Sequence, residues 1–174
     1  MANKGKVSII EEAKNYNNLI NAIKFIKQNE VYVGISDATT IREEETRGEI
    51  TNAELLFIHT NGSPINNIPP RPVIEPAVKN DSDRLSKMMK QAFNLALSGN
   101  KTAALDALKR TGMRAQNVCR TWFTNSENGW PPNSPAVAEA KRRKGAENPR
   151  PLIDTGELRK SITYFVRTLG GRVK

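Results

Sequence analysis

The chain has 174 residues, of which 37% are hydrophobic and only 6% aromatic. This length is enough for a real core, and we expect a single domain over residues 1–174. No apolar run reaches the ~18–20 residues that a membrane-spanning helix needs, and the first fifteen residues lack the apolar stretch of a signal peptide. The single cysteine, Cys119, excludes an internal disulfide and a cysteine-based metal cluster, which favours a reducing cytoplasm.

The net charge of +9 is unevenly distributed along the chain. Residues 1–80 carry 9 basic and 10 acidic side chains, whereas residues 81–174 carry 18 basic and 8 acidic ones. Such asymmetry indicates a polyanion or an acidic protein as a partner. A solvated basic helix surface explains the same pattern.

The first quarter of the chain predicts a helix, a strand and a loop. Apolar residues at three- and four-residue steps predict an amphipathic helix over 11–28, with Tyr16, Leu19, Ile20, Ile23 and Ile26 on one face. The β-branched run from Glu30 to Ser36 predicts a strand. Residues 37–50 are polar and lack periodicity, so we expect a mobile loop there.

A short helix and a stiff segment follow. Thr51 and Glu54 have the spacing of a capping box, and Asn61 with Gly62 ends the helix with turn chemistry. The segment 61–76 holds five of the ten prolines, which fix φ and favour extended geometry. We therefore predict a proline-rich extended arm over 61–76; a stiff connecting loop is the alternative.

The remaining chain predicts two long helices, a short helix and a final strand. The long helices cover 83–97 and 102–123, and their short connection favours an antiparallel pair. Loops are predicted over 126–135 and 145–151. Between them Ser134 and Pro135 mark the start of a helix that ends near Lys144. A helical turn that starts at Asp154 or Thr155 then leads to a strand through Ile162, Tyr164 and Val166.

Candidate chemical groups are few. His59, the only histidine, lies near a helix end and is best interpreted as a surface or capping residue. Cys119 falls on the apolar stripe of its helix and is expected to be a small buried hydrophobe. The adjacent carboxylates Glu43–Glu45 lie in the predicted loop and form a poor metal cage. We therefore expect no enzyme, no catalytic residue, no metal site and no cofactor.

A compact basic run, Lys141, Arg142, Arg143 and Lys144, ends one predicted helix. It is able to contact DNA phosphates in a lumen, or an acidic partner, without reading sequence. Cations that complement the helix dipole are the simpler interpretation.

Three segments occur in an order that resembles a known family: "IPPRPVIEPAV" (68–78), "WPPNSP" (130–135) before a basic helix, and "PLIDTGELRKSITY" (151–164). Together they resemble the tail-completion or neck proteins of tailed bacteriophages, also called head–tail joining or virion-morphogenesis proteins. The resemblance covers roughly residues 30–168. The stretch "HTNGSP" before the first segment, and Val73 and Ile74 within it, depart from the family pattern.

The resemblance implies a structural virion protein, assembled in the host cytoplasm and located at the head–tail junction. Relatives form a ring, commonly of six copies, between the tail tube or its terminator and the head-completion connector, and DNA passes through it. The implied fold is α+β, a small mostly antiparallel sheet packed with several helices, here with the proline-rich arm and the mobile loop. No membrane is involved.

A ring subunit needs a contact surface that does not relax, and the proline segment suits this need. We therefore predict an interface at Ile68, Pro69, Pro70, Arg71 and Pro72, with Arg71 pairing a neighbour's carboxylate, and a further contact at Arg159. Two other functions remain open. The first alternative is a basic nucleic-acid-binding module, and the second is another tail-morphogenesis factor located elsewhere in the tail.

Overall fold

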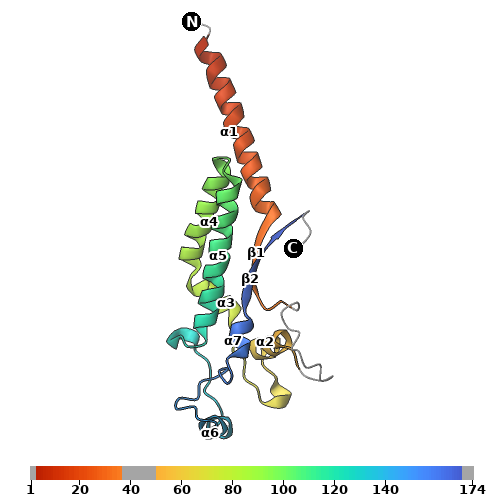
Figure 1. Ribbon diagram of the computed structural model, residues 1–174, viewed down its shortest axis with the longest axis vertical. Helices are drawn as coiled ribbons and strands as arrows, with labels where there is room; N and C mark the ends of the chain where they lie inside the picture. Colours follow the sequence, from red (N-terminus) through yellow and green to blue (C-terminus); the bar gives the residue numbers. More distant parts are fainter. Residues whose placement is uncertain (1–2, 37–49, 170–174) are drawn as a thin grey trace. The chain divides into compact units, whose positions relative to one another are not determined.

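A computed structural model of the protein describes residues 3–36 and 50–169. It has the α+β fold class that the sequence predicts, with seven α-helices and one two-stranded antiparallel sheet in the described residues (Figure 1). The predicted loop 37–50, including Glu43–Glu45, lies outside the described residues except for Ile50. Within the described ranges every helix is too short or too polar to cross a bilayer.

Local sequence signals account for most element boundaries. The capping box forms as predicted, with Thr51 and Glu54 each bonded to the other's backbone N–H, and Gly62 ends the helix. The Ser134 side chain accepts a hydrogen bond from the backbone N–H of Val137, and Pro135 opens that helix. The elements are α1 (Asn3–Gln28), β1 (Asn29–Gly34), α2 (Asn52–Asn61), the 3₁₀ turn η2 (Pro64–Asn66), α3 (Ile74–Asn80), α4 (Ser82–Leu97), α5 (Lys101–Trp122), the 3₁₀ turn η3 (Ser126–Asn128), α6 (Pro135–Arg143), α7 (Glu157–Ser161) and β2 (Thr163–Thr168).

The chain forms two compact units, and each unit combines stretches that are separate in the sequence. Among the described residues, unit 1 comprises 3–32, 83–113 and 165–169, and unit 2 comprises 33–36, 50–82 and 114–164. The expectation of a single domain over 1–174 remains a prediction.

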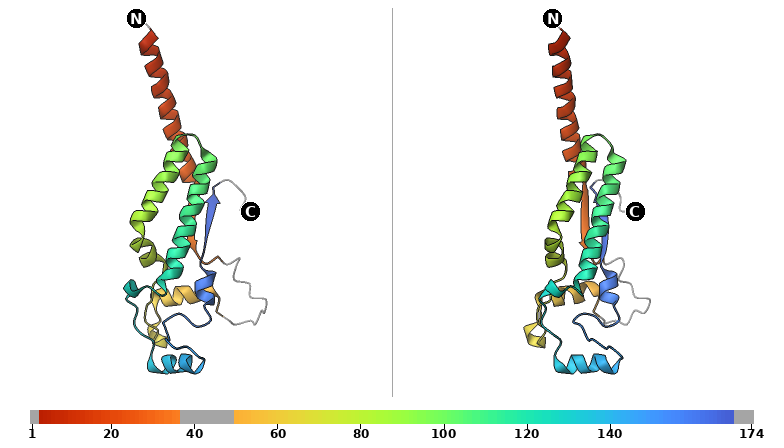
Figure 2. Two further views of the ribbon diagram at one scale, coloured as in Figure 1. Left: turned by 60° about the vertical axis from the view of Figure 1, so that its left-hand side comes forward. Right: turned by 90° about the vertical axis from the view of Figure 1, so that its left-hand side faces the viewer.

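In unit 1, α4 and the first half of α5 run antiparallel, and α1 packs on them through small residues (Figure 1). Ala22, Ala96 and Ala104 are buried together, with Phe25 beside them. Of the five residues that the sequence placed on one apolar face, Ile26 packs against the cluster of Ala92, Ala107 and Leu108, whereas Tyr16, Leu19 and Ile23 are 65%, 40% and 41% exposed. The predicted face is therefore covered only in part within the described residues. The N-terminal half of α1 extends past the turn that joins α4 and α5 (Figure 2).

The core of unit 2 gathers around the end of α5. Cys119, Phe123 and Ile162 are fully buried there, with Val73 and Ala77 from the segment around α3. Burial raises the pKa of the Cys119 thiol to about 11, so this cysteine is the small hydrophobe that its position indicated. Arg120 donates from Nε to the Ile162 carbonyl at 2.9 Å, which ties α5 to the start of β2.

The predicted extended arm over 61–76 is not confirmed. A tight turn begins it, since the backbones of Ser63 and Ile68 exchange two hydrogen bonds of 2.8 and 2.9 Å around η2. Pro76 lies inside α3, and the chain lacks helix or turn between Ile68 and Ile74. Proline is compatible with the first turn of a helix, so five prolines do not imply one continuous extended segment.

Gly62 holds this turn against the following chain. Its φ of 76° and ψ of 174° fall in a region that is essentially restricted to glycine. A Cβ atom at this position would lie 2.9 Å from the Ile68 carbonyl oxygen and 3.0 Å from the Pro70 nitrogen. The backbone therefore leaves no space for any side chain.

We expect Gly62→Ala to lower the free energy of unfolding by about 3 kcal/mol, because backbone strain and a backbone clash add. Gly99→Ala is the matched control: its φ is 83°, but nothing lies within 4 Å of the added atom. It should cost only about 1 kcal/mol. Urea denaturation measures both, and equal losses would contradict the clash.

Candidate functional site

The three sequence segments that resemble the neck family meet around one cavity in unit 2. This cavity, which we call the α2–α6 cavity, has a volume of about 760 Å³. Leu55 and His59 line it from α2, and Val137 and Lys141 from α6. The segments contribute Ile68, Pro69 and Arg71 from the first, Pro132, Asn133 and Ser134 from the second, and Leu152, Asp154, Thr155, Gly156, Glu157 and Leu158 from the third.

Arg71 joins the first segment to the second. Its side chain is 7% exposed, and its Nε and Nη2 atoms donate to the Pro131 carbonyl at 3.1 and 3.0 Å. Nη2 also donates to the Pro132 carbonyl at 3.0 Å. Burial lowers the pKa of Arg71, yet the guanidinium keeps its charge at any ordinary pH. The residue that the sequence assigned to a neighbour's carboxylate thus has an internal structural role.

Trp130 and Asn133 reinforce the same junction. The Trp130 indole N–H donates to the Pro72 carbonyl at 3.0 Å, and its ring packs edge-on against Phe123 at 5.7 Å between ring centres. Asn133 donates from Nδ2 to the Pro149 carbonyl at 3.0 Å. Proline-flanked loops are therefore held by side-chain donors rather than by a strand ladder.

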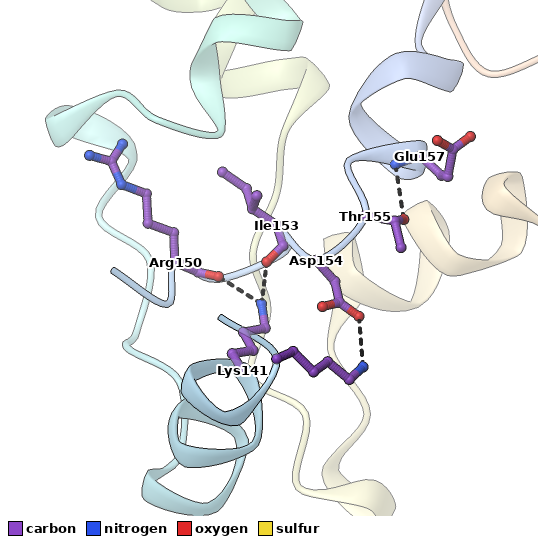
Figure 3. Close-up of polar contacts among 7 residues, drawn as sticks. Lys141, Arg150, Ile153, Asp154, Thr155 and Glu157 are labelled. Atoms are coloured by element: carbon purple, nitrogen blue, oxygen red, sulfur yellow. Dashed lines mark hydrogen bonds and ion pairs between the residues drawn. The ribbon is translucent and has the colours of Figure 1, made fainter. Parts of the chain in front are cut away.

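Lys141 joins α6 to the third segment. Its Nζ atom donates to the carbonyls of Arg150 and Ile153 at 2.8 and 2.5 Å (Figure 3). Burial and the charge of Arg71 lower the pKa of Lys141, whereas Asp154 raises it. Lys141 therefore separates from the rest of the basic run in environment and in role.

The other basic residues of the run lie at the surface in weak ion pairs. Arg142 and Arg143 lie 3.8 and 3.4 Å from Glu139, and Lys144 lies 3.4 Å from Asp154. All three side chains are more than half exposed. Their predicted contact with DNA or an acidic partner remains a prediction.

The predicted interface residues have different surroundings. Pro70 is exposed, whereas Ile68, Pro69 and Pro72 are half-buried. Arg159 is half-buried on α7 and has no hydrogen-bond or ion-pair partner within residues 3–36 and 50–169. Neighbouring Lys160 instead lies 3.1 Å from Glu157.

His59 is the cavity residue that sequence reasoning missed. It is half-buried rather than at the surface, and its Nδ1 atom is buried with no hydrogen-bond partner among the described residues. Burial lowers its pKa, and the charge of Arg71 lowers it further. No local pattern revealed this, because the backbone contact from Arg71 N–H to the His59 carbonyl joins residues twelve positions apart.

The chain matches no protein-family model, no curated protein and no solved structure. The fold class and the cavity are therefore known from the structure alone.

We expect Lys141→Met to lower the free energy of unfolding by about 2–4 kcal/mol. It removes two charge-assisted hydrogen bonds and leaves two carbonyls without a donor. Lys144→Met, in the same turn of helix, removes only an exposed ion pair and should cost less than about 1 kcal/mol. Equal losses of unfolding free energy in the two variants, measured by urea denaturation, would show that the hydrogen bonds of Lys141 do not hold α6 to the third segment.

We expect His59 to make stability depend on pH near neutrality. Its pKa is lowered in the folded state, so between that value and about 6.5 the unfolded chain binds more protons, and stability falls as the pH drops. His59→Gln removes this titration. Between pH 7.5 and 5.5 the wild type should lose more unfolding free energy than the variant; identical losses would contradict this assignment.

Proposed function

We propose that the protein is a structural component of a tailed-phage virion, forming a ring at the head–tail junction that connects the tail tube to the portal-side connector and lets DNA pass. The observation that supports this most is the convergence of three separated segments on the α2–α6 cavity. Those segments are the ones that resemble neck proteins, and their meeting indicates that they act as one structural unit. In this role the chain works by assembly, without a catalytic residue.

Hydrogen bonds within unit 2 order its surface before any partner binds, which favours assembly. A partner gains affinity when a surface is already ordered, because little conformational entropy is lost on contact. Arg71, Trp130 and Lys141 supply this order through side-chain hydrogen bonds. The stiffness that the sequence attributed to prolines thus depends as much on these three donors.

The turn around η2 offers an apolar contact point. Ile65 at its tip is 95% exposed, and Phe57 on α2 is 69% exposed. Large exposed apolar side chains on a fixed backbone are typical centres of protein interfaces. We therefore add Ile65 to Pro70 and Arg159 as a residue of the contact between copies.

The partners in this proposal are further copies, in a six-fold ring, the tail tube or terminator protein, and the head-completion connector. DNA contacts the ring only in transit. Exposed Arg84, Lys87 and Lys90 on α4 supply positive charge for such contacts without base recognition. Tight binding of DNA by the free subunit is not expected.

Light scattering on the purified protein, alone and mixed with isolated phage tails, tests this proposal. We expect a ring-sized species, or uptake at one tail end seen by electron microscopy. Ile65→Asp should abolish either result, because a buried carboxylate without a partner is costly at an interface. Thr60→Asp, at an exposed polar position on nearby α2, is the control and should assemble normally.

Other outcomes separate the remaining functions. A monomer that ignores tails but shifts DNA at physiological salt, with steep salt dependence, would contradict the ring and support a nucleic-acid-binding module. Uptake along the tail rather than at its end would support another tail-morphogenesis factor.

A further inference from the structure

Neither cation that lines the α2–α6 cavity forms an ion pair within the described residues. Arg71 is bonded only to neutral carbonyls, and within residues 3–36 and 50–169 no carboxylate forms an ion pair with it. Lys141 is likewise bonded to two carbonyls. A buried cation ordinarily has an anionic partner, so this wall of the cavity is suited to one from outside.

Donor groups for such an anion remain available. The two N–H groups on Arg71 Nη1 have no partner in the described part of the chain, and Lys141 uses two of its three N–H groups. His59 also lines the cavity, but its Nδ1 atom is itself buried and is not counted among these donors. All three residues line the same cavity.

The two carboxylates of the lining form their ion pairs with other lysines, although the charge of Asp154 also stabilises the charged form of Lys141. Asp154 lies 3.4 Å from Lys144 and Glu157 lies 3.1 Å from Lys160, and neither lysine lines the cavity. The Asp154 and Glu157 side chains are 56% and 53% exposed, whereas Arg71 is 7% exposed. A single carboxylate therefore fits the inner wall, while a phosphate chain would also approach these two acidic groups.

The rest of the lining fits a peptide. Side-chain amides of Asn52 and Asn67 match the hydrogen bonds of peptide groups, and Leu55, Val137 and Leu152 provide apolar contact. A volume of about 760 Å³ lies within the range of about 300–1,000 Å³ that ligand pockets occupy. A short peptide segment is of this size.

We propose that the α2–α6 cavity is a binding site for a short acidic peptide segment of a partner protein, whose carboxylate pairs with Arg71 and Lys141. Asparagine amides hold the peptide backbone, and Val137 packs on the segment from α6. The assignment goes beyond the ring, because it describes a site of the isolated subunit.

The test titrates the full chain with acetyl-Ala-Ala-Glu-Ala-amide and follows the side-chain N–H signals of Arg71 and the backbone signals of Thr155 and Gly156 by NMR. We expect saturable shifts at these positions. The peptide with Gln in place of Glu should bind about ten-fold more weakly, because it loses the charge-assisted pairing. Equal binding of the two peptides would overturn the proposal, as would shifts confined to other surfaces.

Variants on α6 provide the second arm without disturbing the bonds of Arg71 or Lys141. Val137→Glu places a carboxylate in the cavity lining and should weaken binding about ten-fold by like-charge repulsion. Val137→Gln has the size of the Glu variant without its charge and should weaken binding much less, through the lost apolar contact alone. Ala136→Glu, exposed on the same helix and outside the lining, controls for net charge. Equal effects of the two Glu variants would contradict a site in the cavity.

Sodium acetate is the last comparison. Acetate that binds as well as the peptide would overturn the peptide assignment, because the asparagine and Val137 contacts would then contribute nothing. Because the titration needs no assembly, peptide binding by a monomer that ignores tails would leave this site intact while removing the ring.

Discussion

Unit 2 depends on one buried cation. Arg71 donates three hydrogen bonds to carbonyls sixty residues further along the chain, and its guanidinium supplies the donors that prolines lack. Without it, the carbonyls of Pro131 and Pro132 would lose their donors in a partly buried environment. The first two segments around the cavity would then have no polar connection at this point other than the indole of Trp130.

The same solution recurs wherever a proline-flanked loop crosses another. Trp130, Asn133 and Lys141 each donate to a carbonyl at or beside a proline, and no strand ladder is present at these places. Such bonds add little net stability when formed, but their loss is expensive because both partners are desolvated. A consequence of using cations as donors is that Arg71 and Lys141 bring positive charge to the cavity lining.

Local signals in the sequence predicted the elements well. The capping box at Thr51, the turn at Gly62 and the helix start at Ser134 each depend on residues within four positions of one another, so their chemistry is visible along the chain. The stripe of α5 through Ala115, Cys119 and Trp122 is buried as its spacing indicated.

Longer-range choices were not predictable in this way. The sequence placed Arg71 at a surface because nothing near it in the chain reveals carbonyls at Pro131 and Pro132. It grouped the large apolar residues of α1 on one face but did not reveal that Ala22 packs with Ala96 and Ala104. The five prolines of 61–76 also do not distinguish an extended arm from a turn followed by a helix, since proline fits both.

The junction around Trp130 has a spectroscopic consequence. Both tryptophans of the chain, Trp122 and Trp130, lie in unit 2, one in its core and one bonded to the Pro72 carbonyl. Tryptophan emission is therefore a local reporter of unit 2 and is blind to the packing of α1 on α4. Circular dichroism at the helix bands, by contrast, draws heavily on unit 1. Comparing the two signals during denaturation separates the melting of one unit from that of the other without any label.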